Sequence, residues 1–173
     1  PVSRNSLSDL LEYYEDAYLL FSVPEFTRSL ANNMRSASKV YAVDPAMFGA
    51  FSPASALDQG QRLETAVFNA LRRRTPAVRI GSVCRLLIKE KSKSHEVDFV
   101  AGDALLMRAY SLIQVSVDMA SEKTREREIA ALDASMAQFD LGESAIVTMD
   151  EQADIPCEHG AVHVVPAWKW LLA

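Results

Sequence analysis

Alternation of apolar and polar residues predicts a short strand at residues 96–100. A strand has a side-chain period of two, so Glu96 and Asp98 are expected on one face, with Val97 and Phe99 on the other. A strand that carries two carboxylates on one face can belong to a metal site or to a half-solvated sheet.

The same alternation recurs at residues 112–118. It predicts a second strand with Ile113, Val115 and Val117 on one face and the more polar set on the other: Leu112, Gln114, Ser116 and Asp118. Two adjacent strands that present carboxylates, an amide and a hydroxyl can hold a hard divalent cation. A half-solvated sheet with its polar face outward also explains the two strands, and taken alone they favour this interpretation.

The remaining pattern predicts helices and strands in alternation along most of the chain. Apolar residues at helical spacing favour three main helices, and short apolar runs bounded by proline, glycine or charged residues favour further strands. The helices are expected at 6–20, 58–73 and 122–140, with a short one after Pro166, and the strands at 18–23, 39–43, 78–88, 144–149 and 161–165.

The helix at 58–73 carries one acidic residue on its apolar side. Glu64 lies three residues before Val67 and seven before Leu71, so it projects toward the stripe that should face the core. A core-facing carboxylate is costly unless it is paired or bound to a metal. Its partner is therefore expected to be a metal ion or a nearby cation, for which the candidates are Arg62, Arg72 and Lys39.

Length and composition exclude several classes of protein. The chain has 173 residues, 49% hydrophobic and 24% charged, which suits one globular core and excludes a disordered or fibrous protein. No apolar run is as long as a membrane span, and the first residues do not resemble a signal peptide. Cys84 and Cys157 lack CxxC or CxxH companions, which favours reduced thiols in a cytoplasmic protein.

Charge is unevenly distributed in a chain whose formal net charge is −5. Residues 72–93 hold eight lysines and arginines against one acid, whereas 118–158 are strongly acidic. The basic segment is a candidate nucleic-acid-binding surface, or else a helix end and strand edge kept soluble by cations. Its candidate contacts are Arg72, Arg73, Arg74, Lys89 and Lys91.

From residue 58 the expected order is helix, strand, strand, strand, helix, strand. This αβββαβ order resembles the restriction-endonuclease-like, or PD-(D/E)XK, core, which implies an α/β fold with a mixed sheet flanked by helices. In that superfamily a glutamate on the first helix, an aspartate on the second strand and E-x-K on the third build an Mg²⁺ site. The matching positions hold Glu64, Asp98, Gln114 and Ser116.

A second resemblance comes from short sequence words in a fixed order. They resemble the C-terminal part of predicted bacterial and archaeal AAA-type ATP-binding proteins, in which a P-loop ATPase module and a winged-helix-like segment precede a nuclease-like domain. This implies a winged-helix-like remnant at 1–52 and a nuclease-like domain at 53–173. The words are SKVYAVD (38–44), RLETAVFNALRRR (62–74), EVDFV (96–100), LIQV (112–115), TRERE (124–128) and VVPAWKWLL (164–172).

The third strand departs from the superfamily pattern. Gln114 replaces an acid, and Ser116 stands where the lysine is expected, so the site has lost one negative charge and its cation. Lys91 or Lys93, from the turn before the 96–100 strand, is a candidate replacement cation. The resemblance thus implies a degenerate site of Glu64, Asp98 and Gln114, with Glu96 and Lys93 beside it and Glu64 and Asp98 as metal ligands.

Three functions remain open on the sequence alone. The favoured one is the C-terminal nuclease-fold module of an AAA-type ATPase, impaired in cutting, that contacts nucleic acid or protein. The others are an Mg²⁺-dependent DNA or RNA endonuclease and a structural docking domain. Because the chain lacks a GxxxxGK[ST] loop, no ATP site is expected in it. Expected partners are the chain's own ATPase module and nucleic acid, with no membrane; an oligomer is compatible with the sequence.

Overall fold

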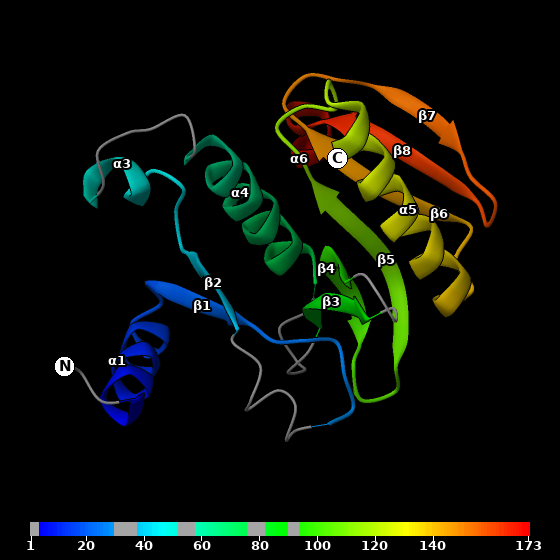
Figure 1. Ribbon diagram of the computed structural model, residues 1–173. Helices are drawn as coiled ribbons and strands as arrows, with labels where there is room; N and C mark the ends of the chain where they lie inside the picture. The colour runs from blue at the N-terminus through cyan, green and yellow to red at the C-terminus, as the bar shows by residue number, and fades with distance from the viewer. Residues whose placement is uncertain (1–3, 30–37, 52–57, 76–81, 90–93) are drawn as a thin grey trace.

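A computed structural model describes residues 4–29, 38–51, 58–75, 82–89 and 94–173. Its core is a mixed sheet of six strands in the order β3-β4-β5-β6-β8-β7, with helices on both faces (Figure 1). The elements are α1 (Arg4–Asp16), β1 (Leu20–Val23), β2 (Lys39–Ala42), α3 (Met47–Phe51), α4 (Asp58–Arg74), β3 (Val83–Lys89), β4 (Ser94–Asp103), β5 (Arg108–Val115), α5 (Glu122–Phe139), β6 (Glu143–Thr148), β7 (Ala153–Pro156), β8 (Ala161–Pro166) and α6 (Ala167–Leu172).

The predicted α/β class and the αβββαβ order from α4 to β6 are confirmed. Strands β3, β4 and β5 form an antiparallel meander, and β5 pairs in parallel with β6 after the α5 crossover. A parallel pair needs such a long connection, and α5 supplies it. Strand β7, which the sequence analysis did not predict, pairs antiparallel with β8 at the sheet edge.

Each face of the sheet has its own apolar core. On one face α4 packs through Leu63, Val67, Phe68 and Leu71 against Phe99, Ile113 and Val147. On the other face α5 packs through Leu132 and Met136 against Val97, Val100, Leu112 and Ile146. The predicted facing of Ile113 and Val115 away from Leu112 is confirmed, because Val115 packs with the α4-side core.

One helix and one strand end earlier along the chain than predicted. The first helix stops at Asp16 rather than continuing to residue 20, and Tyr18 follows with a left-handed backbone (φ 58°). Strand β5 begins at Arg108 and ends at Val115, so Val117 lies outside it. Beyond the strand the Ser116 hydroxyl donates to the Asp118 carbonyl at 2.6 Å, which turns the chain toward α5.

A two-stranded hairpin, β1–β2, lies beside α4 and apart from the six-stranded sheet (Figure 1). The segment that follows β1 runs along the outer edge of β3: Arg85 donates its N–H to the Pro24 carbonyl, and Phe26 donates its N–H to the Arg85 carbonyl. Covering an edge strand in this way removes a template for aggregation. The predicted boundary between residues 52 and 53 lies outside the described residues.

Both cysteines are free thiols, as predicted. Cys84 is fully buried in the α5-side core, and burial raises the pKa of its thiol to about 12. No helix in the described part of the chain combines the length and the apolar character that crossing a membrane requires.

Candidate functional site

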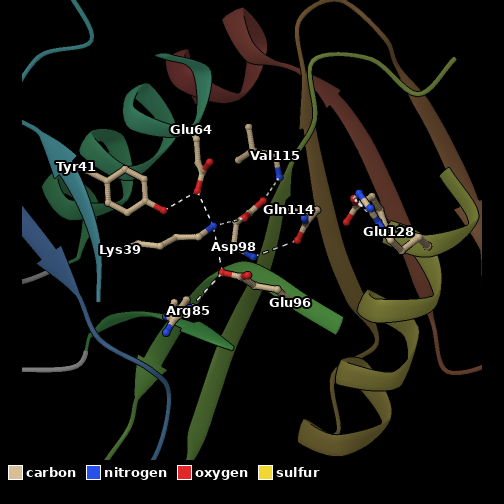
Figure 2. Close-up of polar contacts among 10 residues, drawn as sticks. Lys39, Tyr41, Glu64, Arg85, Glu96, Asp98, Gln114, Val115 and Glu128 are labelled. Carbon is tan, nitrogen blue, oxygen red and sulfur yellow. Dashed lines mark hydrogen bonds and ion pairs between the residues drawn. The ribbon is translucent and has the colours of Figure 1, made fainter. Parts of the chain in front are cut away.

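Three carboxylates from two elements converge on one ammonium group. The Nζ atom of Lys39 lies 2.9 Å from Glu64 Oε1 and 2.8 Å from Asp98 Oδ1, and it donates hydrogen bonds to both (Figure 2). The third contact, 3.1 Å to Glu96 Oε1, is an ion pair without hydrogen-bond alignment. A lysine therefore lies at the centre of the acidic cluster, which we call the Lys39 site.

Strand β2 brings Lys39 to the cluster together with Tyr41. Residues two apart on a strand share a face, so both side chains point toward α4 and the sheet. The Tyr41 hydroxyl donates to Glu64 Oε1 at 2.6 Å, and its ring stacks on Phe68 with the centroids 4.7 Å apart. The aromatic stack fixes the hairpin against α4, which holds the ammonium group in place.

A β-bulge turns Asp98 toward Lys39. Leu86 pairs with Val97 and Cys84 with Val100, so Arg85 of β3 faces two residues of β4, Asp98 and Phe99. The prediction that Val97 and Phe99 share a face is therefore wrong: Val97 packs in the α5-side core and Phe99 in the α4-side core. An extra residue in one strand interrupts the alternation, and here it re-aims a carboxylate.

Strands β4 and β5 separate at the level of Asp98. The last residue pair of the two strands at this end is Phe99 with Ile113. Beyond it, hydrogen bonds between side chains and backbone connect the two strands. Gln114 Oε1 accepts the Asp98 N–H at 3.1 Å, and Asp98 Oδ2 accepts the Val115 N–H at 3.0 Å. These bonds place Gln114 next to Asp98, with its acceptor oxygen bonded to the backbone rather than to Lys39.

Burial makes the electrostatics of the Lys39 site strong. Asp98 is 7% exposed, and burial together with the Glu64 carboxylate raises its pKa to about 6, against the opposing effect of Lys39. Burial acts to lower the pKa of Lys39, but the Asp98 and Glu64 carboxylates outweigh it and hold that pKa above its usual value. Burial, and then Glu64, likewise raise the pKa of Tyr41. At neutral pH the lysine is thus charged and the tyrosine is a hydrogen-bond donor.

Two hollows flank the site. One, of about 310 Å³, is lined by His95, Glu96, Asp98, Gln114, Arg127, Glu128 and Ala131. The other, of about 210 Å³, is lined by Lys39, Val40, Tyr41, Phe48, Gln61, Glu64 and Thr65. The cluster of carboxylates thus lies between two openings rather than in a closed core.

The fate of the predicted site residues is mixed. Glu64, Asp98 and Glu96 come together, and Lys39 is the partner of Glu64 among the three candidate cations named from the sequence. Lys91 and Lys93, the predicted replacement cations, lie outside the described residues. The sequence analysis did not assign Lys39 to the site centre, although it lies in the word SKVYAVD at 38–44. Tyr41 and Glu128 were also missed.

The three arginines predicted to bind nucleic acid lie at the C-terminal end of α4 and are exposed. Arg72 stacks over the Phe21 ring at 3.6 Å, and Arg74 stacks over Trp170 at 4.3 Å and donates to its carbonyl oxygen at 2.7 Å. These contacts join α4 to β1 and α6, so two of the three arginines also have structural roles. The side chain of Lys89 lies outside the described residues.

A separate group with metal-ligand chemistry lies between α5 and the β7–β8 turn. Ligand atoms of Asp133, Glu158 and His159 lie within 4.8 Å of one another. The His159 ring nitrogen Nδ1 is already 3.1 Å from Asp133 Oδ2, and the His159 backbone N–H donates to Asp133 Oδ1. These contacts join the turn to α5, so the group has a structural role without a metal ion. His163, predicted as an ordinary strand residue, lies in β8 beside Asp154.

Comparison with known proteins identifies a relative whose function is not known. The chain is 33% identical over 178 residues to an uncharacterized protein of Methanocaldococcus jannaschii. The alignment covers 99% of this chain and 37% of that protein, so the chain spans just over a third of the relative's length. No family model and no solved structure matches the chain.

Proposed function

We propose that this chain is a nuclease-fold interaction module in which a lysine takes the place of the catalytic metal, so that the module binds a partner without cutting nucleic acid. We propose further that it is the C-terminal module of an AAA-type ATPase. The observation that carries the proposal is the position of Lys39 Nζ, in contact with Glu64, Glu96 and Asp98.

The arrangement of donors does not fit a divalent metal ion. Asp98 uses one carboxylate oxygen for Lys39 and the other for the Val115 N–H, while Gln114 uses its amide oxygen for the Asp98 N–H. Mg²⁺ requires oxygen ligands near 2.0–2.1 Å in octahedral geometry, and it gives up its bound water molecules reluctantly. Binding it here requires the ammonium group to leave and at least two hydrogen bonds to break.

The position of Ser116 supports the same proposal. The superfamily lysine is expected two residues after Gln114. That position holds Ser116, which lies just beyond the end of β5 and whose hydroxyl donates to the Asp118 carbonyl. The cation in the Lys39 site comes from the hairpin, outside the αβββαβ core. It offsets part of the negative charge of the three acids and ties the hairpin to the sheet, which is a structural use of the same carboxylates.

Partner binding is favoured by the share of the relative that the chain covers. The Methanocaldococcus jannaschii protein is much longer than the matching segment, so a module of this size in such a protein has another part of the same chain to contact. A protein partner is favoured over nucleic acid because two of the three arginines at the end of α4 stack on aromatic rings of the same chain.

The convergence of Glu64 and Asp98 also favours a second candidate, an Mg²⁺-dependent endonuclease in which Lys39 is the site cation. The two candidates differ in one measurable property. We expect no cleavage of single- or double-stranded DNA or RNA by the wild-type chain with Mg²⁺ or Mn²⁺. Metal-dependent cleavage by the wild type that is lost in Asp98→Ala contradicts the proposal and establishes the second candidate. Cleavage that persists in Asp98→Ala identifies a contaminating nuclease.

A further inference from the structure

Glu128 is a buried carboxylate that the Lys39 site does not use. It lies on α5, is 6% exposed, and faces Gln114 across the larger hollow (Figure 2). Its Oε1 atom accepts from Arg127 Nη2 at 2.6 Å and Nε at 3.2 Å. No described residue forms a hydrogen bond or ion pair with its Oε2 atom. A buried charge is unfavourable unless it is compensated, so an open acceptor on a buried acid points to a ligand.

Arg127 compensates Glu128 only from outside. It is the preceding residue on the same helix, and its side chain is 64% exposed while that of Glu128 is 8% exposed. The guanidinium group therefore lies at the rim of the hollow and does not fill it. Its contacts with Oε1 show that this carboxylate accepts a guanidinium group at hydrogen-bond distance.

The rest of the hollow is acidic. Glu96 and Asp98 line its far side, and a buried nitrogen of the His95 ring, Nδ1, has no hydrogen-bond partner in the described part of the protein. Lys39 contacts both of these far-side acids, and Arg85 lies 3.7 Å from Glu96. Glu128 is thus the acid of the hollow whose charge is met only from the rim, and its open oxygen favours a group with N–H donors over a phosphate or any other anion. The unpartnered Nδ1 atom of His95 is a further acceptor for such a group in the tautomer that carries the ring proton on Nε2.

The spacing of the acceptors selects the kind of cation. A metal ion needs ligand atoms gathered closely, and the described residues with three such atoms within 4.8 Å of one another are Asp133, Glu158 and His159, outside this hollow. A guanidinium group carries five N–H donors on a rigid plane and can bridge acceptors that one ion cannot. The volume of about 310 Å³ also admits the methylene groups of an arginine side chain.

We propose that the hollow between β4, β5 and α5 binds an arginine side chain of a protein partner, with Glu128 as its main acceptor. The inference rests on the proposed function as an interaction module, and it names the chemistry by which the partner is recognised. Buried interface positions of this kind commonly hold an arginine anchor.

The test uses agmatine as the probe, because it carries the arginine guanidinium group on a similar chain. N-carbamoylputrescine, in which a neutral urea replaces the guanidinium group, is the matched probe. Chemical shifts of the Gln114 side-chain amide and of residues 95–98 and 127–131 report binding at the hollow. The variant is Glu128→Gln, and the matched control is Glu126→Gln, an exposed glutamate on the same helix.

We expect saturable shifts with agmatine and none with N-carbamoylputrescine. Affinity should fall by about tenfold or more in Glu128→Gln, because a charge-assisted hydrogen bond is lost, and should stay unchanged in Glu126→Gln. A thermal melt accompanies each variant; Glu128→Gln should be at least as stable as the wild type, since it removes a buried charge.

Three results overturn this proposal: no shift at these residues with agmatine, equal binding by Glu128→Gln, or a response to Mn²⁺ or a single-stranded oligonucleotide in place of agmatine. All three results come from binding measurements and not from a cleavage assay. Nuclease activity of the wild type defeats the proposed function without changing the agmatine result, so the two failures are distinguishable.

Discussion

Replacing Lys39 by methionine is the most informative perturbation of the site. Methionine keeps most of the apolar length of the side chain but removes the ammonium group, so Glu64, Glu96 and Asp98 lose the cation that they share. The carboxylates then repel one another in a partly buried setting. The variant should be less stable at neutral pH.

The magnitude follows from the burial of the partners. Removing one member of a buried ion pair costs about 3–5 kcal/mol, but Lys39 is 29% exposed and Glu96 36% exposed, so solvent reduces the loss. We expect a decrease of roughly 2–3 kcal/mol in the free energy of unfolding. For a chain of this size that is a fall of roughly 5–10 °C in Tm.

The assay is urea denaturation at pH 7, with Lys123→Met as the control because that lysine is exposed on α5. The additional substitution Asp98→Asn in the Lys39→Met background removes one of the uncompensated charges and should restore part of the lost stability. If Lys39→Met unfolds at the same urea concentration as the wild type, or if Asp98→Asn restores nothing, the lysine does not hold the carboxylates together.

Three further predictions concern neighbouring residues. Tyr41→Phe removes the hydroxyl that donates to Glu64, and should lower the free energy of unfolding by roughly 1.5–3 kcal/mol in urea denaturation; no change means that the bond does not form in solution. The pKa of Asp98 is raised to about 6, so its carboxyl group stabilises the fold most below about pH 4, and this contribution is lost as pH rises through 6. The free energy of unfolding of the wild type, relative to that of Asp98→Asn, should therefore fall by roughly 3 kcal/mol across that range. A flat difference across the titration refutes the shift. Gly102→Ala would place a Cβ atom 2.3 Å from the Arg108 carbonyl oxygen, so it should destabilise the β4–β5 hairpin; a wild-type Tm argues against that close approach.

Local periodicity predicted those parts of the fold that depend on it. Apolar residues at helical spacing predicted the helix at 122–140, which is α5, and the Ser121 side chain caps it by accepting the Thr124 N–H. The αβββαβ order followed because each of these elements has a clear period and a clear boundary. The approach of Glu64 to Asp98 was predicted from that order, and both contact the same lysine nitrogen.

The features that were not predicted depend on contacts between residues far apart in the sequence or lack a local apolar pattern. The bulge at Asp98 and Phe99 depends on pairing with β3, so alternation within β4 alone placed Phe99 on the wrong face. Lys39 is far from Asp98 in sequence, and only the packing of the β1–β2 hairpin on α4 brings them together. Strand β7 is short and mostly exposed at an edge, and it therefore lacks an apolar pattern.

A direct test of the central claim is a calorimetric titration of Mn²⁺ into the wild type and into Lys39→Met. With the ammonium group in place, the wild type should show no Mn²⁺ binding that depends on Asp98. In Lys39→Met the carboxylates of Glu64, Glu96 and Asp98 are free to close around one ion, and this binding should be lost on the further substitution Asp98→Asn. Binding of Mn²⁺ by the wild type that Asp98→Asn abolishes would contradict the account, because it would mean that the lysine leaves room for a metal.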